Sequence, residues 1–117
     1  MAQRSVIIVI DNQTSQDLVF SAANYSHGAP LSQPPQNIPP HTSSPEWEVD
    51  SDGFATGVEG TITYHFQSDS SKLVNLYFDD PFVGSNAFSG QAPDGYSVST
   101  TATGGNNVYV IYTLTGP

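Results

Sequence analysis

The alternation of apolar and polar residues in the middle of the chain predicts a β-hairpin. Between residues 61 and 66 every second residue is apolar, which is the pattern of a strand with one buried face. Residues 67–72 are polar and rich in Ser, as expected of a turn. Residues 73–78 predict a second strand, with apolar residues on both faces, which indicates burial on two sides. The predicted core of the hairpin consists of Ile62, Tyr64, Phe66, Leu76 and Phe78.

The loops that flank this hairpin are the first place to look for function. If the two strands pair antiparallel, the loop before the first strand and the loop after the second must lie at the same end of the sheet. These loops cover residues 53–60 and 79–90, and both contain glycine and phenylalanine. We therefore expect a binding surface at that end.

The rest of the chain predicts further short strands. They are expected at residues 5–10, 18–20, 46–50, 97–102 and 108–114. The first two are separated by a short polar turn, which predicts an opening hairpin, and Trp47 is predicted to lie in the core. Residues 22–45 contain six prolines and favour an irregular connector, and residues 87–96 are predicted to be a loop. With no helical periodicity and no second domain, residues 1–117 are expected to form one antiparallel β-sandwich.

Composition narrows the classes of ligand. The net charge is −9, with only two Lys and Arg residues, so the chain lacks the basic surface that nucleic acids require. The same sign argues against attraction to anionic lipids, which leaves neutral or zwitterionic headgroups, aromatic insertion or sterol contact as ways to reach a membrane. Only 11% of the residues are charged, so Ser, Thr, Asn, Gln and Gly must cover much of the surface.

No pattern of catalytic or metal-binding residues stands out. The histidines His27, His41 and His65 are widely spaced and there is no cysteine, so no metal site is expected. Asp79 and Asp80 are adjacent in a strand, so their side chains should point to opposite faces. We expect neither an enzyme nor a cofactor. The apolar run at residues 6–10 is too short for a signal peptide core or a membrane span.

Six residues are candidates for ligand binding at the predicted loops: Phe54, Phe82, Phe88, Tyr25, Glu59 and Asp79. The aromatic side chains can insert into a membrane interface or stack on a sugar. Glu59 lies between two glycines and is either a surface carboxylate or an acceptor for a headgroup. Tyr25, close to His27 and Gly28, belongs either to a plain connector or to a binding loop.

Two segments carry a resemblance to a known family. Residues 52–64 (DGFATGVEGTITY) and 76–86 (LYFDDPFVGSN) resemble the aegerolysins, most closely the small aegerolysin-like component of bacterial binary insecticidal proteins. Residues 5–14 and 108–114, at the two ends of the chain, also fit that family.

The resemblance implies a cytolysin-like β-sandwich that binds membranes. Family members recognise lipids such as sphingomyelin with cholesterol, or ceramide phosphoethanolamine, and commonly permeabilise membranes with a larger partner protein. Homo-oligomers on the membrane are also possible. In fungal members a Trp follows the Pro of the second loop, a position that falls on Phe82 here. Their lipid-contacting Glu falls on Thr56, and Glu59 comes three residues later.

We therefore expect the lipid-binding component of a two-protein, pore-forming and insecticidal toxin system. The alternative is a lectin-like module that binds a carbohydrate or glycolipid and forms no pore. With no signal peptide recognised, cytoplasmic synthesis is expected, followed by release as an inclusion or by non-classical secretion. The site of action would be the membrane of a target cell.

Overall fold

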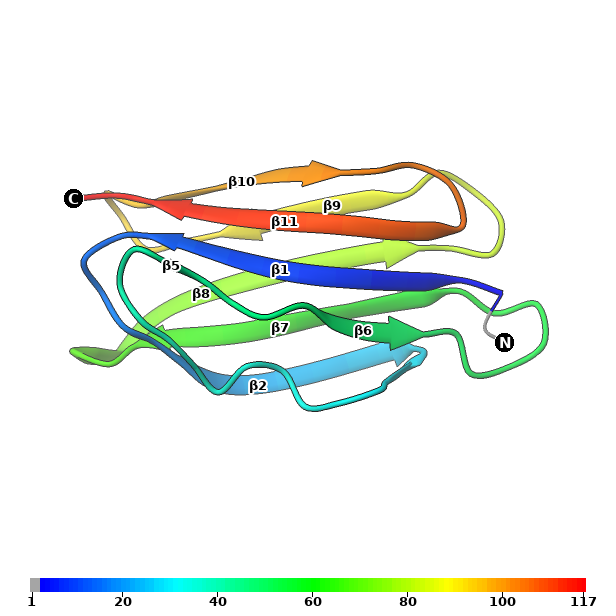
Figure 1. The fold of residues 1–117 in the computed structure, drawn as a ribbon, viewed down its shortest axis with the longest axis horizontal. Coiled ribbons are helices and arrows are strands. Elements are labelled where there is room, and N and C mark those ends of the chain that lie inside the picture. Colours follow the sequence, from blue (N-terminus) through cyan, green and yellow to red (C-terminus); the bar gives the residue numbers. More distant parts are fainter. Residues whose placement is uncertain (1–2) are drawn as a thin grey trace.

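The computed structural model describes residues 3–117 and contains strands but no helix in that range. Two sheets pack face to face as a sandwich (Figure 1). The strands are β1 (Ser5–Gln13), β2 (Leu18–His27), β3 (Ala29–Pro30), β4 (Asn37–Ile38), β5 (Thr42–Ser43), β6 (Trp47–Asp50), β7 (Val58–Phe66), β8 (Asp69–Asp80), β9 (Ala87–Gln91), β10 (Ser97–Ala102) and β11 (Asn107–Thr115). Within the described chain no helix is long and apolar enough to cross a membrane.

The first sheet has the order β10-β11-β1-β6-β3, with β5 also paired to β1, and the second has the order β4-β2-β7-β8-β9. Neighbouring strands pair antiparallel, with the exception of β1 and β11, which run parallel along their whole length. The predicted all-β sandwich is therefore confirmed.

The core lies between the sheets and is built from the alternating apolar residues of the long strands. The predicted core residues Ile62, Tyr64, Phe66, Leu76 and Phe78 are all buried, and so are Trp47 and Val49 of β6. The expectation that β8 is buried on both faces is wrong. Its outward residues are partly or largely exposed, and Leu73 is 44% exposed. The reason is that each sheet of a sandwich is covered on one face only.

The predicted opening hairpin is also wrong, because β1 and β2 belong to different sheets. The turn between them carries the chain across the sandwich, and the buried side chain of Asn12 stabilises it. Its Nδ2 donates to the carbonyl oxygens of Gln16 (2.7 Å) and Ile38 (3.1 Å), and its Oδ1 accepts from the backbone N–H of Thr14 (3.1 Å). Polarity alone does not distinguish such a crossing from a hairpin turn.

Two predicted irregular segments contain strands. Residues 87–91 of the expected loop form β9, and the expected connector contributes the second half of β2 as well as β3, β4 and β5. The proline-rich part stays close to the core because Tyr64 Oη donates a hydrogen bond to the carbonyl oxygen of Pro35 (2.7 Å). Proline leaves only isolated N–H groups for pairing, which explains why these strands have two residues each.

Strand direction brings the proposed loops together. β7 and β8 pair antiparallel, with Val58 opposite Asp80, so the predicted central hairpin is confirmed and its flanking loops lie at one end. Figure 1 shows this end at the right of the view, where the loop of residues 51–57 extends furthest. The loop of residues 81–86 and the turn of residues 103–106 lie at the same end. We call these three segments together the loop end.

Candidate functional site at the loop end

A groove of about 320 Å³ lies between the loop of residues 51–57 and the loop of residues 81–86. We call it the central groove. Its lining consists of His27, Ala55, Thr56, Gly57, Val58, Glu59, Asp79, Pro81 and Phe82. A larger hollow of about 580 Å³ lies beside Phe54 and Leu31, and a third of about 410 Å³ lies beside Arg4.

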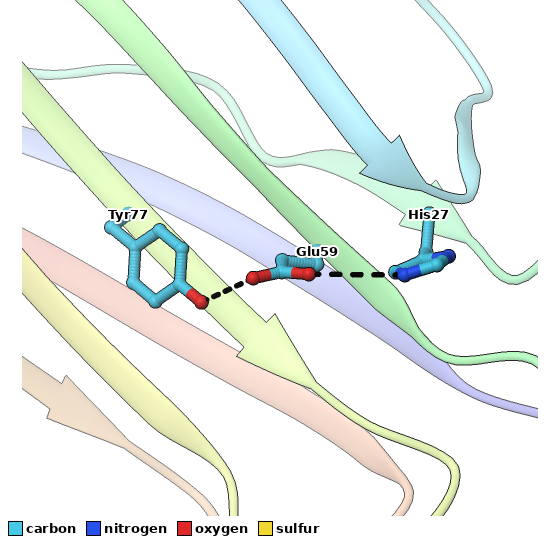
Figure 2. Close-up of polar contacts among 3 residues, drawn as sticks. All are labelled: His27, Glu59 and Tyr77. Carbon is cyan, nitrogen blue, oxygen red and sulfur yellow. Dashed lines mark hydrogen bonds and ion pairs between the residues drawn. The ribbon is translucent and has the colours of Figure 1, made fainter.

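Three side chains from neighbouring strands form a polar row beside the central groove. Figure 2 shows Tyr77 of β8, Glu59 of β7 and His27 of β2 in line across the sheet. Tyr77 Oη donates to Glu59 Oε2 at 2.5 Å, and Glu59 Oε1 lies 3.9 Å from His27 Nε2. The hydrogen bond to Glu59 is the main reason that the pKa of Tyr77 is raised to about 12. The row therefore holds the Glu59 carboxylate in one orientation.

Asp79 adds a second carboxyl group to this row. It lies directly opposite Glu59 in the β7–β8 ladder, so the two side chains share the outer face of the sheet. Burial, and then the nearby charge of Glu59, raise the pKa of Asp79 above its ordinary value. Two acidic groups with partial burial at one wall of a groove favour a cationic ligand group, which would relieve their mutual repulsion.

The loop of residues 51–57 projects Phe54 into solvent. The Phe54 side chain is 90% exposed. Its turn is held by Thr56, whose Oγ1 accepts from the N–H of Gly53 (3.0 Å) and donates to the Gly53 carbonyl (2.9 Å). Ala55 has a φ of 55°, a strained left-handed conformation, and its N–H donates to Gln3 Oε1 (3.0 Å). A large apolar side chain is thus presented on a well-braced turn.

The two loops touch at Gly57. A Cβ at this position would lie 2.7 Å from the carbonyl oxygen of Asp80 and 2.9 Å from the backbone nitrogen of Phe82. Both neighbours are backbone atoms, so they could not move aside without a shift of the second loop. Glycine is required here by close approach, and this contact fixes the width of the central groove.

Arg4 holds the second loop from the other side. Its Nη2 donates to the carbonyl oxygen of Phe82 (2.9 Å) and its Nε to that of Pro81 (3.4 Å), while the guanidinium lies 4.6 Å from the centre of the Phe82 ring. The Phe82 ring is therefore half-buried, whereas the next residue, Val83, is 84% exposed. Asn86 ties the loop to the turn of residues 103–106 by donating to the Gly105 carbonyl (3.0 Å).

Asp80 is an unusual buried group beneath this loop. Its side chain is 1% exposed, and neither carboxyl oxygen has a hydrogen-bond partner within residues 3–117. Burial raises the pKa of Asp80 to about 6, although the charge of Arg4 opposes this shift in part. The expectation that Asp79 and Asp80 point to opposite faces is confirmed, since Asp79 faces the groove and Asp80 the core.

The structure brings together four of the six sequence-predicted site residues. Glu59, Asp79 and Phe82 line the central groove, and Phe54 lies on the loop that forms its other wall. Glu59 and Asp79 were expected in the flanking loops but lie in β7 and β8, because the strand pairing extends further than the apolar alternation. Their role in binding remains a prediction.

Tyr25 and Phe88 were expected on loops, and this placement is wrong. They lie in β2 and β9, partly buried against the core, and the Tyr25 ring packs on Phe78 with 6.4 Å between ring centres. Partly buried and exposed residues alternate around both positions, so packing rather than exposure accounts for the two aromatic residues.

Three residues in or next to the loop end were missed by sequence reasoning. Val83 follows Phe82 in a loop bounded by Pro and Gly, and this context could have marked it as exposed. Tyr77 was assigned only to a strand. Arg4 left no local signal, because its contact with Phe82 spans 78 residues. Among residues 3–117 no group of three or more His, Asp or Glu side chains is arranged to hold a metal ion.

Comparison with known proteins places this chain in a family. The sequence profile of the aegerolysins matches residues 3–111. An uncharacterized protein of Dictyostelium discoideum is 34% identical over 112 residues, which cover 95% of this chain and 10% of the relative. The chain therefore spans about a tenth of the length of the curated relative that it matches.

Solved structures share the fold at low sequence identity. The lipid-binding protein Nakanori has a TM-score of 0.83 at 12% identity, over 98% of this chain and 72% of that one. RahU, solved in complex with a TRIS molecule, has a TM-score of 0.78 at 12% sequence identity, and the match covers 100% of this chain and 98% of RahU. IP-1A from Alcaligenes faecalis has a TM-score of 0.68 at 18% sequence identity, and the match covers 96% of this chain and 91% of IP-1A. With the profile matching almost the whole sequence, the chain belongs to the aegerolysin family.

Proposed function

We propose that this protein binds membrane lipids through the loop end, with the lipid headgroup in the central groove. The observation that carries the proposal is the combination of exposed apolar side chains and an acidic groove at one end of the molecule. Phe54 and Val83 are 90% and 84% exposed on the two loops that enclose Glu59 and Asp79. Membership of the aegerolysin family supports it, as does a fold shared with a protein described as lipid-binding.

The charge distribution favours a headgroup that carries an ammonium group. Glu59 and Asp79 offer carboxylate oxygens to a cation, and the bond from Tyr77 leaves further lone pairs of Glu59 free. A net charge of −9 repels anionic membranes, so the ammonium should belong to a zwitterionic headgroup. Phosphocholine and phosphoethanolamine lipids, including sphingomyelin and ceramide phosphoethanolamine, are of this class.

We further propose that membrane damage requires a larger partner protein, as one half of a pore-forming, insecticidal pair. The exposed apolar side chains of the loop end are Phe54, Val83 and part of Phe82, and Leu31, which is 65% exposed, lies beside Phe54. Burying each such side chain contributes roughly 1.5–3 kcal/mol before the costs of ordering and association, which supports weak and reversible attachment. Dye release from vesicles should therefore need both this protein and its partner.

Glu59→Gln tests the headgroup assignment. Flotation with vesicles of phosphatidylcholine, and of the same lipid with ceramide phosphoethanolamine or with sphingomyelin and cholesterol, should show binding of the wild type. The substitution removes the charge but keeps the shape, and a charge-assisted contact is worth about 1.5–3 kcal/mol, so affinity should fall roughly 10–100-fold. Asp94→Asn is the matched control, because this exposed residue lies in the β9–β10 turn at the opposite end.

Two results would count against the proposal. Equal loss in the Glu59 and Asp94 variants would show that net charge, rather than the groove, governs binding. Retention on a glycan array without flotation on any vesicle would favour the lectin-like alternative.

A further inference from the structure

Charge is divided unequally between the two flanks of the sandwich. Ten of the eleven acidic residues and both basic residues lie in residues 1–80, whereas Asp94 is the one charged residue of 81–117. This last third of the chain contains β9, β10 and β11, which lie together along the upper flank in Figure 1. A protein of net charge −9 thus has one nearly uncharged flank, which we call the neutral flank.

The outermost strand of this flank, β10, has a free edge. It ends the first sheet and pairs with β11 alone. Thr103 N–H donates to the carbonyl of Tyr109 (3.0 Å). Along an antiparallel strand the backbone groups of successive residues point alternately toward and away from the partner strand, so this bond fixes which residues of β10 point toward β11. It follows that the backbone N–H and C=O groups of Ser97, Ser99 and Thr101 point to β11. Those of Val98, Thr100 and Ala102 point outward.

The other edges of the sandwich are guarded. On the opposite flank β3 and β4 have two residues each and lie among prolines, which cannot donate to a new strand. The edge of β2 beyond its pairing with β4 is interrupted by irregularities at Phe20/Ala22 and Tyr25/His27. On the neutral flank β9 is weakened by Gly90, which packs so closely under Val98 that any side chain would collide with it. β10 contains no Pro, Gly or charged residue and is built of Ser, Thr, Val and Ala.

We propose that two copies of this chain associate by antiparallel pairing of β10 with β10, centred on Thr100. Thr100 would lie opposite Thr100 of the second chain across a two-fold axis, and Val98 would lie opposite Ala102 of the second chain. This register allows up to about six backbone hydrogen bonds between the chains. The neutral flank is where two chains of charge −9 approach with least repulsion. Because the two-fold axis is perpendicular to the sheet, the two loop ends point in opposite directions.

The pair should be weak and should strengthen with salt. A six-residue edge buries less than the roughly 800 Å² per partner of a stable interface, so dissociation constants of about 10–500 µM are expected. Salt screens the repulsion between the two acidic bodies but has little effect on backbone hydrogen bonds. An interface held by opposite charges would weaken instead.

Sedimentation velocity over about 10–500 µM tests the proposal. The wild-type mass should rise with concentration from 12.5 kDa toward twice that value. Thr100→Pro removes the outward N–H at the centre of the pair and leaves the bonds to β11 in place, so association should weaken at least about tenfold. Thr100→Val keeps this N–H and should associate like the wild type. Thr100→Glu, a second variant, places like charges opposite one another and should also dissociate.

Amide hydrogen exchange gives a readout at single residues. Exchange at Val98, Thr100 and Ala102 should slow as concentration rises, while Ser99 and Thr101 should be protected at every concentration because they bond to β11. A wild type that stays at 12.5 kDa throughout would overturn the proposal. So would equal association of the Pro and Val variants, or concentration-dependent protection confined to β2 or β9.

Discussion

Phe54→Ala is expected to reduce vesicle binding by roughly 10–100-fold. The Phe54 side chain is 90% exposed on a turn braced by Thr56 and Gln3, so it is available to the bilayer without rearrangement. Moving a phenylalanine from water into an apolar environment is worth about 1.5–3 kcal/mol, which corresponds to the stated range. Flotation or surface plasmon resonance on phosphatidylcholine vesicles that contain ceramide phosphoethanolamine measures this loss.

Leu73→Ala is the matched control for Phe54→Ala. Leu73 is an exposed apolar residue, but it lies near the start of β8, towards the opposite end from the loops. Its removal should leave vesicle binding within about twofold, and neither variant should change the folded state measurably because surface substitutions are usually mild. Equal losses in the two variants would mean that general hydrophobicity, rather than the loop end, attaches the protein.

Asp80→Asn is expected to increase the free energy of unfolding at pH 8 by about 1–3 kcal/mol, with Tm higher by several degrees. The Asp80 carboxyl is 1% exposed and has no hydrogen-bond partner within the described chain, so its charged form is poorly solvated. An amide of the same shape carries no charge and avoids this penalty. Thermal and urea unfolding of both proteins from pH 4 to pH 8 measures the difference.

The sign of the pH dependence follows from the pKa of Asp80. Its ordinary value is 3.8 and burial raises it to about 6 in the folded protein, so folding favours the protonated form. The stabilisation is fully present below pH 3.8 and is lost as pH rises through about 6. The advantage of Asp80→Asn should therefore be largest above pH 6 and disappear near pH 4.

Comparing the wild type with Asp80→Asn separates the contribution of Asp80 to the pH dependence of stability from that of other titratable groups. The pKa of Glu48 is also raised, to about 7, first by its hydrogen bond with Asp50, so the wild type gains stability on acidification at more than one site. Glu48 is present in both proteins and cancels in the difference. A lower stability of Asp80→Asn at pH 8 would show instead that attraction to Arg4 outweighs the cost of burial.

The alternation of apolar and polar residues was sufficient to predict those strands in which one face is buried. The alternation in residues 61–66, together with the apolar residues of 73–78, located the central hairpin and its core, and antiparallel geometry placed the flanking loops at one end. The opening strands were misassigned, because the parallel pairing of β1 with β11 joins segments about a hundred residues apart. Nothing local to residues 5–20 reports such a partner.

The site was predictable where exposure follows from loop chemistry. Phe54 and Phe82 sit beside Gly and Pro, and both were located in the correct loops. Tyr25 and Phe88 were not, because an aromatic residue near a turn signal can equally end a strand and pack on the core. The role of Arg4 depends on the three-dimensional approach of the N-terminal segment to the loop of residues 81–86.

Fluorescence of a tryptophan placed at position 54 tests the proposed lipid-binding surface most directly. The natural Trp47 is 5% exposed in the core, so its emission should provide a constant background. In Phe54→Trp, added vesicles with brominated acyl chains should shift the new emission to the blue and quench it, whereas Leu73→Trp should change in neither respect. Quenching at position 73 with none at position 54 would contradict the assignment of the loop end as the membrane-binding surface.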